Sequence, residues 1–182
     1  IGTWSYFSGV TGTVNDPTNF VTFVDLVSNG ESVWRWTIDR EGCISFDEIT
    51  ITDNTVTSDA DLALNPNLID ICTDEYTLNA TDPGSFNPPF SMPLATGNWT
   101  GAANFDNNSV FNTTVRDLSA SNVLTWTIAK GSCTQSSNII INNNEFTVDA
   151  DVNTDPNYLE TCTGSLNMDG EQPAGGIGKW TI

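Results

Sequence analysis

The sequence predicts an all-β fold of tandem antiparallel β-sandwiches, each of about 90 residues, and three observations support this prediction. Short runs rich in Val, Ile, Thr and aromatic residues recur along the 182-residue chain, separated by clusters of Asn, Asp, Gly and Pro. No stretch shows the sustained 3.6-residue period of an amphipathic helix. The third observation is an internal repeat, which sets the length of one sandwich.

The repeat relates two stretches of the chain at a spacing of 90 residues. Its matched motifs are Trp36-Thr37-Ile38 with Trp126-Thr127-Ile128, Cys43 with Cys133, Asp59-Ala60-Asp61 with Asp149-Ala150-Asp151, and Cys72-Thr73 with Cys162-Thr163. A Gly-x-Trp motif occurs three times, beginning at Gly2, Gly97 and Gly178. Because the sequence starts and stops near this motif, we expect two repeats in a circularly permuted frame.

Five runs are expected to form strands, and turn residues bound each of them. In chain order they are Phe20 to Val27, Val33 to Ile38, Phe46 to Thr52, Val123 to Ile128 and Asn138 to Ile141. Strands at intervals of about ten residues, in units of about ninety, are typical of an antiparallel sandwich of immunoglobulin size.

The tryptophans are expected to lie in the core. Side chains alternate along a strand, so Trp34 and Trp36 share one face. The second copy has Leu124 and Trp126 at these positions, and a face that accepts Trp or Leu equally is a core face. The Gly-x-Trp motifs add Trp4, Trp99 and Trp180 to the predicted core. A role in stacking on sugar rings is the alternative.

The charge balance excludes several classes of function. The chain has 23 Asp and Glu against 5 Lys and Arg, a formal net charge of −18, and no His. So few cations cannot neutralise a nucleic-acid backbone, and they argue against docking on anionic lipid. No run approaches the ~18 apolar residues of a membrane span. Without His, most hydrolase and zinc chemistries are also disfavoured.

Acidic segments recur between the repeats and are candidate calcium ligands. Carboxylate and amide oxygens are the ligands that Ca²⁺ prefers. The candidates are Asp149, Asp151, Asn153 and Asp155 in one segment and Asp59, Asp61 and Asn65 in the other. Calcium there would neutralise carboxylates and stiffen a junction between sandwiches. The alternative is a solvated acidic linker.

Catalysis is not expected. The adjacent carboxylates Asp47-Glu48 and Asp74-Glu75 are the candidates for the acid and base of a glycosidase. Neighbouring strand residues point to opposite faces, so neither pair would share a site.

Several short motifs resemble a known family. The chain carries Gly2-Thr3-Trp4-Ser5, Asp16-Pro17, Trp36-Thr37-Ile38, Gly42-Cys43, Ile49-Thr50-Ile51-Thr52, Asp149-Ala150-Asp151, Glu160-Thr161-Cys162, Ser165-Leu166-Asn167 and Gly178-x-Trp180. This run resembles the tandem PKD-like and immunoglobulin-like repeats of Bacteroidetes surface adhesins exported by the type IX secretion system, including gliding-motility adhesins of the SprB kind. The resemblance implies immunoglobulin-like (PKD-like) sandwiches at the cell surface. A longer insert before the second cysteine of each unit, around Asn65-Pro66-Asn67 and Asp155-Pro156-Asn157, departs from the family pattern.

The family frame implies a division of the chain. Residues 56–145 would be a complete sandwich, 1–55 the C-terminal part of one sandwich, and 146–182 the N-terminal strands of another. Either flanking chain completes the outer pieces, or 146–182 completes residues 1–55 of a neighbouring copy, which would generate an open filament.

Four cysteines without CxxC spacing favour disulfides and an oxidising, extracellular setting. In the family frame the bridge within a domain is Cys72–Cys133, and Cys43 and Cys162 pair outside the fragment or in trans. The alternative, Cys43–Cys72 with Cys133–Cys162, follows the symmetry of the repeat.

The sequence therefore predicts a non-catalytic structural repeat segment of an extracellular adhesin or cell-surface filament. Its expected partners are further copies of itself, head to tail, and surface polysaccharide, with Ca²⁺ as the candidate cofactor. One alternative is a carbohydrate-binding module of a secreted protein, with Tyr6, Phe7, Phe86 and Phe90 as candidate aromatic residues. Another is a pilin-like subunit that assembles by strand donation.

Overall fold

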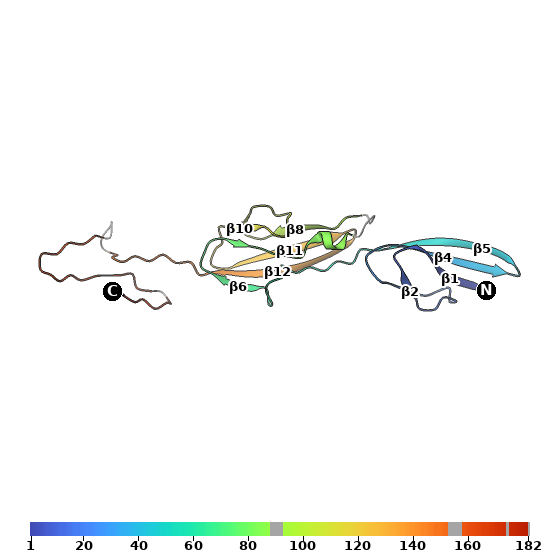
Figure 1. Cartoon of the computed structure of the whole chain (residues 1–182), viewed down its shortest axis with the longest axis horizontal. Helices are drawn as coiled ribbons and strands as arrows, with labels where there is room; N and C mark the ends of the chain where they lie inside the picture. Colours follow the sequence, from blue (N-terminus) through green and yellow to red (C-terminus); the bar gives the residue numbers. More distant parts are fainter. Residues whose placement is uncertain (88–92, 153–157, 174, 182) are drawn as a thin grey trace. The chain divides into compact units, whose positions relative to one another are not determined.

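The computed structural model describes residues 1–87, 93–152, 158–173 and 175–181, and in these ranges the fold is all-β (Figure 1). The chain divides into two compact units, Ile1–Asn144 and Glu145–Ile182. In the described ranges the only helical element is a 3-10 turn, η1 (Pro83–Phe86), which Asp82 caps by accepting a hydrogen bond from the Gly84 N–H. No helix in these ranges is long and apolar enough to cross a membrane.

The first unit begins with a three-stranded antiparallel sheet, which we call the N-terminal sheet. Its strands are β1 (Gly2–Gly9), β4 (Gly30–Arg40) and β5 (Cys43–Asp53), in the order β1-β4-β5. A small ribbon of β2 (Gly12–Val14) and β3 (Val24–Leu26) lies between β1 and β4 in sequence. The turn from β4 to β5 consists of Glu41 and Gly42, both at positive φ, which suits the right-handed twist of a tight hairpin.

The rest of the first unit is a two-sheet sandwich, which we call the complete sandwich. One sheet has the order β6-β12-β11-β8, and its strands are β6 (Leu68–Ile71), β12 (Cys133–Asn143), β11 (Asn122–Lys130) and β8 (Thr96–Thr100). The other has the order β7-β10-β9, with β7 (Tyr76–Thr77), β10 (Thr114–Arg116) and β9 (Asn104–Phe105). A single buried cluster draws on both sheets, including Leu124, Trp126, Ile128, Ile139 and Ile141 from the first and Val115 from the second.

Strand register recurs at a spacing of 90 residues. Trp36 of β4 lies opposite Asp47 of β5, and Trp126 of β11 lies opposite Ser137 of β12. The Gly-x-Trp strands behave alike, because Trp4 pairs with Trp36 and Trp99 pairs with Trp126. The ring centroids of these two pairs are 5.1 and 5.0 Å apart. The N-terminal sheet is thus built like the β8-β11-β12 part of the complete sandwich.

The all-β prediction is confirmed, and the structure refines its details. Four of the five expected runs lie within longer strands, whereas Phe20 to Val27 yields only the three-residue β3. The fold is also not purely antiparallel, because β6 pairs in parallel with β12. Asn54, which follows β5, lies near Gly131 in the β11–β12 turn. From there the chain runs in the same direction as β12 and joins the edge of the sheet as β6. The immunoglobulin-like topology and the division at residue 55 stay predictions.

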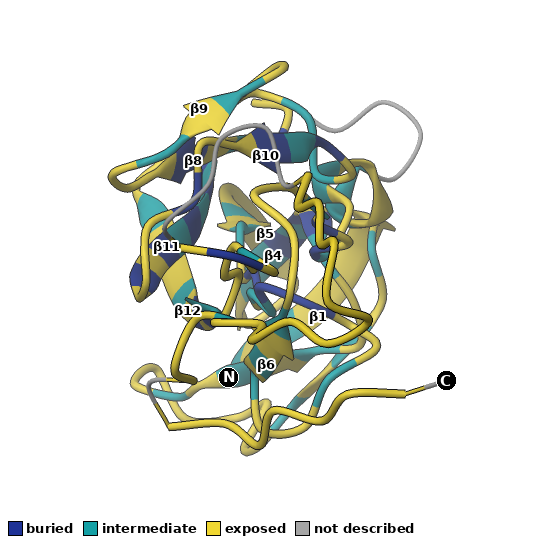
Figure 2. Cartoon of the chain, turned by 90° about the vertical axis from the view of Figure 1, so that its left-hand side faces the viewer, coloured by how far each residue is buried: buried dark blue, intermediate teal, exposed yellow. Residues whose placement is uncertain are grey.

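The second unit contains no regular strand or helix in its described residues, and we call residues 145–181 the tail. Two backbone hydrogen bonds close a loop in it, from Val152 N–H to Asp169 O at 3.0 Å and from Glu171 N–H to Asp149 O at 2.9 Å. Its large apolar side chains are exposed, among them Phe146, Met168 and Trp180. Figure 2 colours nearly all of this trace as exposed.

Candidate functional site

The first acidic segment forms a turn in which its carboxylates accept protein hydrogen bonds. Asp59 Oδ1 accepts from the Asp61 N–H at 3.2 Å and from Asn67 Nδ2 at 2.7 Å. Asp61 is fully buried, and its Oδ1 accepts from the Ala63 N–H at 2.9 Å. Its Oδ2 accepts from the Tyr76 hydroxyl, also at 2.9 Å. These oxygens accept hydrogen bonds from local donors, as in Asx turns, and calcium binding at this segment stays a prediction.

The Asp61 contact also changes the acidity of its partner. Burial, followed by the hydrogen bond to Asp61, raises the pKa of Tyr76 from 10.0 to about 12. A phenolate beside this carboxylate would be both desolvated and repelled, so the tyrosine stays a neutral donor. Tyr76 therefore ties β7 to the acidic turn of the complete sandwich.

The second acidic segment repeats the geometry of the first. Asp149 Oδ1 accepts from the Asp151 N–H at 3.0 Å, as Asp59 accepts from Asp61. The backbone pairing of Asp149 with Glu171 matches that of Asp59 with Thr81. The other calcium candidates, Asn153 and Asp155, lie outside the described residues. Within the part of the chain that the structure describes, no group of three or more Asp, Glu, Cys or His side chains could hold a metal ion.

The N-terminal sheet has an uncovered apolar face. Ile38 of β4 is 48% exposed, whereas Ile128, the residue 90 positions later, is fully buried. Ile49 of β5 is 49% exposed, and its counterpart Ile139 is again fully buried. Figure 2 colours parts of β8, β10 and β11 of the complete sandwich as buried. The two sheets have matching strands but differ in what lies over them.

In the complete sandwich, the segment between β5 and β8 covers the corresponding face of β11 and β12. Its apolar residues Val56, Ala60, Leu78 and Ala80 belong to the buried core cluster. The Trp126 indole N–H donates to the Thr81 carbonyl at 3.0 Å, which pins the segment above β11. The Ser58 hydroxyl donates to the Trp126 carbonyl at 3.1 Å, so hydrophobic burial and two part-buried hydrogen bonds hold the segment in place.

The tryptophans follow the same division. Trp99, Trp126 and Trp34 are buried as predicted, and Trp4 and Trp36 are half-buried. Trp180, which the sequence places in a core, is 57% exposed because the tail provides no second layer for it within the described residues. Trp99 donates its indole N–H to the Val110 carbonyl at 3.1 Å. The buried indole nitrogens of Trp4 and Trp34 find no acceptor among the described residues.

The candidate sugar-binding aromatics do not form a platform where they are described. Tyr6 packs edge-on against Trp34, whereas Phe7 lies over the Arg35 guanidinium, on the other face of β1. Phe46 contacts the same guanidinium at 4.2 Å, so Arg35 is held by two rings. Phe86 is half-buried, and Phe90 lies outside the described residues. These contacts give the aromatics packing roles.

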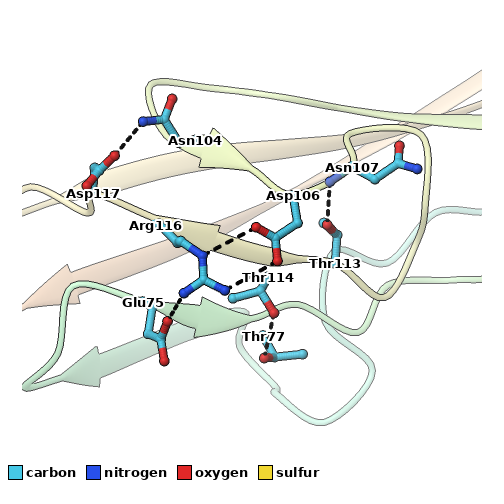
Figure 3. Close-up of polar contacts among 9 residues, drawn as sticks. All are labelled: Glu75, Thr77, Asn104, Asp106, Asn107, Thr113, Thr114, Arg116 and Asp117. Atoms are coloured by element: carbon cyan, nitrogen blue, oxygen red, sulfur yellow. Dashed lines mark hydrogen bonds and ion pairs between the residues drawn. The ribbon is translucent and has the colours of Figure 1, made fainter.

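One member of each pair of adjacent carboxylates, Glu48 and Glu75, lies in a surface ion pair. Glu48 accepts from Arg35 at 2.7 Å, and Asp47 Oδ1 accepts from the Glu48 N–H. Glu75 pairs with Arg116, which also contacts Asp106 at 3.3 Å (Figure 3).

Figure 3 shows this second cluster on the β7-β10-β9 sheet. Thr77 and Thr114 share a hydrogen bond at 3.2 Å, and Asn104 donates to Asp117. The hydrogen bonds and the ion pairs of Arg116 link the three strands across their polar face. This arrangement supports the sheet.

All four cysteines are free thiols in this structure. Cys72 directly follows Ile71, which pairs with Asn143 at the end of β12, whereas Cys133 begins the same strand. The two residues are therefore separated by about ten strand residues, roughly 33 Å, where a disulfide requires Cα atoms within about 7 Å. The complete sandwich thus lacks the Cys72–Cys133 bridge predicted within it. Pairing between copies stays a prediction.

Comparison with known proteins adds little. No protein-family model matches the chain, and no curated protein matches it significantly. One similar solved structure is described as "Crystal structure of the S-layer protein SbsC domains 4 and 5". It is 14% identical, with a TM-score of 0.30, and the match covers 78% of this chain and 70% of that one. A likeness this weak assigns the chain neither a family nor a function.

Proposed function

We propose that this protein is a non-catalytic structural repeat segment of an extracellular adhesin or cell-surface filament. The observation that carries the proposal is the recurrence of one strand register along the chain, with a complete sandwich between two partial copies of its parts. A sandwich that buries its own core can be repeated in tandem to extend a fibre. Such a fibre body needs no active site.

The polar side chains support a structural role. The carboxylates of the first acidic turn are engaged by backbone and tyrosine donors, and the arginines Arg35 and Arg116 lie in surface ion pairs. The net charge of −18 would keep a long fibre soluble and separate from anionic surfaces. We propose that Ca²⁺, where it binds, does so at the segment that includes Asp149 and Asp151, and that surface polysaccharide is a secondary partner.

The proposal is tested by locating the protein on cells that produce it. An antibody raised against the purified chain should label intact cells, and protease treatment of intact cells should remove the label. Immunogold microscopy should then place the label along fibres or a surface coat. Label that appears only after the cells are permeabilised would overturn the proposal.

A further inference from the structure

We propose that the tail of one copy binds the uncovered face of the N-terminal sheet of a second copy and completes a sandwich there. This inference rests on the proposed structural function and names its mode of assembly: non-covalent, head to tail, by donation of the tail. The donor is the tail, through its described residues 145–152 and 158–173, and the acceptor face is marked by Ile38 and Ile49. The occupant is a second copy of this chain.

The acceptor face matches the face of β11 and β12 that residues 56–81 cover in the complete sandwich. The β1-β4-β5 sheet repeats the register of β8-β11-β12, including its stacked tryptophan pair. In the complete sandwich, Ile128 and Ile139 are fully buried in a cluster to which the segment of residues 56–81 contributes Val56, Ala60, Leu78 and Ala80. Their counterparts Ile38 and Ile49 remain about half exposed. A segment similar to 56–81 should therefore bind this face and bury both residues.

The tail is such a segment, displaced by 90 residues. Its loop has the same backbone pairing as the cover, because Val152–Asp169 and Glu171–Asp149 correspond to Leu62–Asn79 and Thr81–Asp59. The tail thus already forms the turn that residues 59–81 form over β11 and β12. A pre-formed turn reduces the ordering entropy lost on binding.

The apolar side chains of the tail are those that a cover would bury. Val56 and Leu78 are 4% and 0% exposed, whereas Phe146 and Met168, 90 residues later, are 77% and 60% exposed. Both halves of the proposed interface therefore expose residues whose counterparts are buried in the complete sandwich. The indole of Trp36 gains a specific acceptor as well, since its counterpart Trp126 donates to Thr81 and the tail has Glu171 at that position.

The free edge of β5 provides the second part of the interface. In the complete sandwich, β6 pairs in parallel with residues 140–143 of β12. The corresponding pairing joins residues 158–161 of the donor to residues 50–53 of the acceptor. Strand β5 is an edge strand among the described residues, so its outer backbone groups are available for this addition.

The position at which the tail starts favours a second copy over the same chain. Asn54, where the N-terminal sheet ends, lies against Gly131 at the β11–β12 turn, whereas the Asn144 N–H bonds to Ile71 at the other end of β12. The eleven-residue β12 separates these two points by roughly 36 Å. The tail places Asp149 only five residues beyond Asn144, a reach of at most about 18 Å.

The assembly also brings together two cysteines of different copies. Cys72 follows the strand that ends beside Asn144, so Cys162 of the donor would lie beside Asn54 of the acceptor. Asn54 contacts Gly131, two residues before Cys133. Donation therefore brings donor Cys162 near acceptor Cys133, whereas acceptor Cys43 lies ten residues away along β5.

The first test measures association of the full chain by sedimentation velocity and negative-stain microscopy over a range of concentrations. Both interacting pieces are acidic, so association should strengthen as salt is raised. We expect open linear oligomers. A chain that stays monomeric at all concentrations and salt levels would overturn the proposal.

The second test uses variants that separate donor from acceptor. Ile38→Glu introduces a charge on the acceptor face, and Met168→Glu does so on the tail; both positions are exposed in the single chain. Each variant alone should lose linear growth, with association weakened at least about tenfold, or 1.4 kcal/mol. An equimolar mixture should form dimers only, since each variant retains one intact half.

The control is Val123→Glu, which is 54% exposed on β11 of the complete sandwich and should associate like the parent chain. Equal loss in this control, or parent-like growth of both test variants, would overturn the proposal.

The third test uses a short bis-maleimide, which links two thiols without an oxidant. A chain carrying Cys43→Ser and Cys72→Ser retains Cys133 and Cys162 and should give a ladder of covalent multimers. The matched chain carrying Cys72→Ser and Cys133→Ser retains Cys43 and Cys162 and should not. Cross-linking confined to the monomer would place the tail on its own chain and overturn the proposal. Cell-surface labelling is independent of all three results, so failure of this inference is distinguishable from failure of the proposed function.

Discussion

The N-terminal sheet and the complete sandwich contain two versions of the same three strands in different surroundings. The β4–β5 and β11–β12 hairpins have matching registers, and each carries a Trp–Trp pair with its Gly-x-Trp strand. Ile128 is fully buried in a cluster that includes the covering segment, whereas Ile38 is about half exposed. Strand sequence therefore selects the core face, whereas a separate segment determines whether that face is buried.

The largest effect expected from this comparison is at the paired tryptophans. Trp126→Ala removes a fully buried ring and its hydrogen bond to Thr81, and should cost about 3–5 kcal/mol of unfolding free energy. The matched Trp36→Ala change removes a half-buried ring and should cost less than about 2 kcal/mol in the monomeric chain. Urea unfolding followed by circular dichroism measures both. Equal losses would show that the two faces are equally well covered.

Two glycines that contact these rings provide a finer comparison. A Cβ at Gly97 would lie 2.2 Å from the Trp126 ring, and one at Gly2 would lie 2.3 Å from the Trp36 ring. Trp126 cannot move, because it is packed and hydrogen-bonded, so Gly97→Ala should cost about 1–3 kcal/mol. Trp36 can shift toward the open face, so Gly2→Ala should cost under about 1 kcal/mol. A larger loss at Gly2 than at Gly97 in thermal unfolding would contradict the proposed difference.

The acidic turn of the complete sandwich predicts a pH dependence. The pKa of Tyr76 is raised to about 12 in the folded chain, so its contribution is fully present below pH 10, the ordinary tyrosine pKa. That contribution is lost as the pH rises from about 10 to 12. Melting temperatures across this range should fall more steeply for the parent chain than for Tyr76→Phe. Parallel profiles would show that Tyr76 is not coupled to folding.

The smallest effects are expected at the two surface arginines. Arg116→Gln breaks exposed ion pairs with Glu75 and Asp106 and should lower the melting temperature by at most about 3 °C, less at high salt. Arg35→Gln also removes the contacts with Phe7 and Phe46, so its effect should persist in high salt. Melting curves at low and high salt distinguish them. If both variants lost the same amount of their effect at high salt, the contacts of Arg35 with Phe7 and Phe46 would not contribute to stability.

Much of this fold could be predicted from residue patterns. Alternation along residues 122–130 and 33–38 identifies strands and their inward faces, and the repeated Trp-Thr-Ile motif predicts that these strands are equivalent. The repeated Asp-Ala-Asp motif likewise identifies two equivalent acidic turns, but its hydrogen-bond partners could not be predicted. Hydrogen bonds to Asp59 and Asp61 come from residues as distant as Tyr76, and such tertiary contacts leave no local signal in the sequence.

The exposure of Ile38 and Ile49 could not be read from their own strands. Their sequence environment is that of a core, and only the position of the covering segment distinguishes them from Ile128 and Ile139. The assignment of Trp180 to a core failed for the same reason, because its motif is intact while the layer opposite is missing from the described residues. A Cys72–Cys133 bridge does not form within one chain, because the eleven-residue strand β12 keeps these two cysteines apart.

The parallel pairing of β6 with β12 has a mechanical consequence for a fibre. A pull along the fibre draws the C-terminal end of β12 one way and the N-terminal end of β6 the other. The bonds between the two strands include Ile140 N–H to Asn67 O, Asn144 N–H to Ile71 O, and Asn142 to Asp70 through their side chains. Because the two strands are parallel, tension loads these hydrogen bonds together in shear. They do not break one after another, as they would if the strands were peeled apart. In the proposed fibre, the complete sandwich would therefore resist stretching through its β6–β12 bonds.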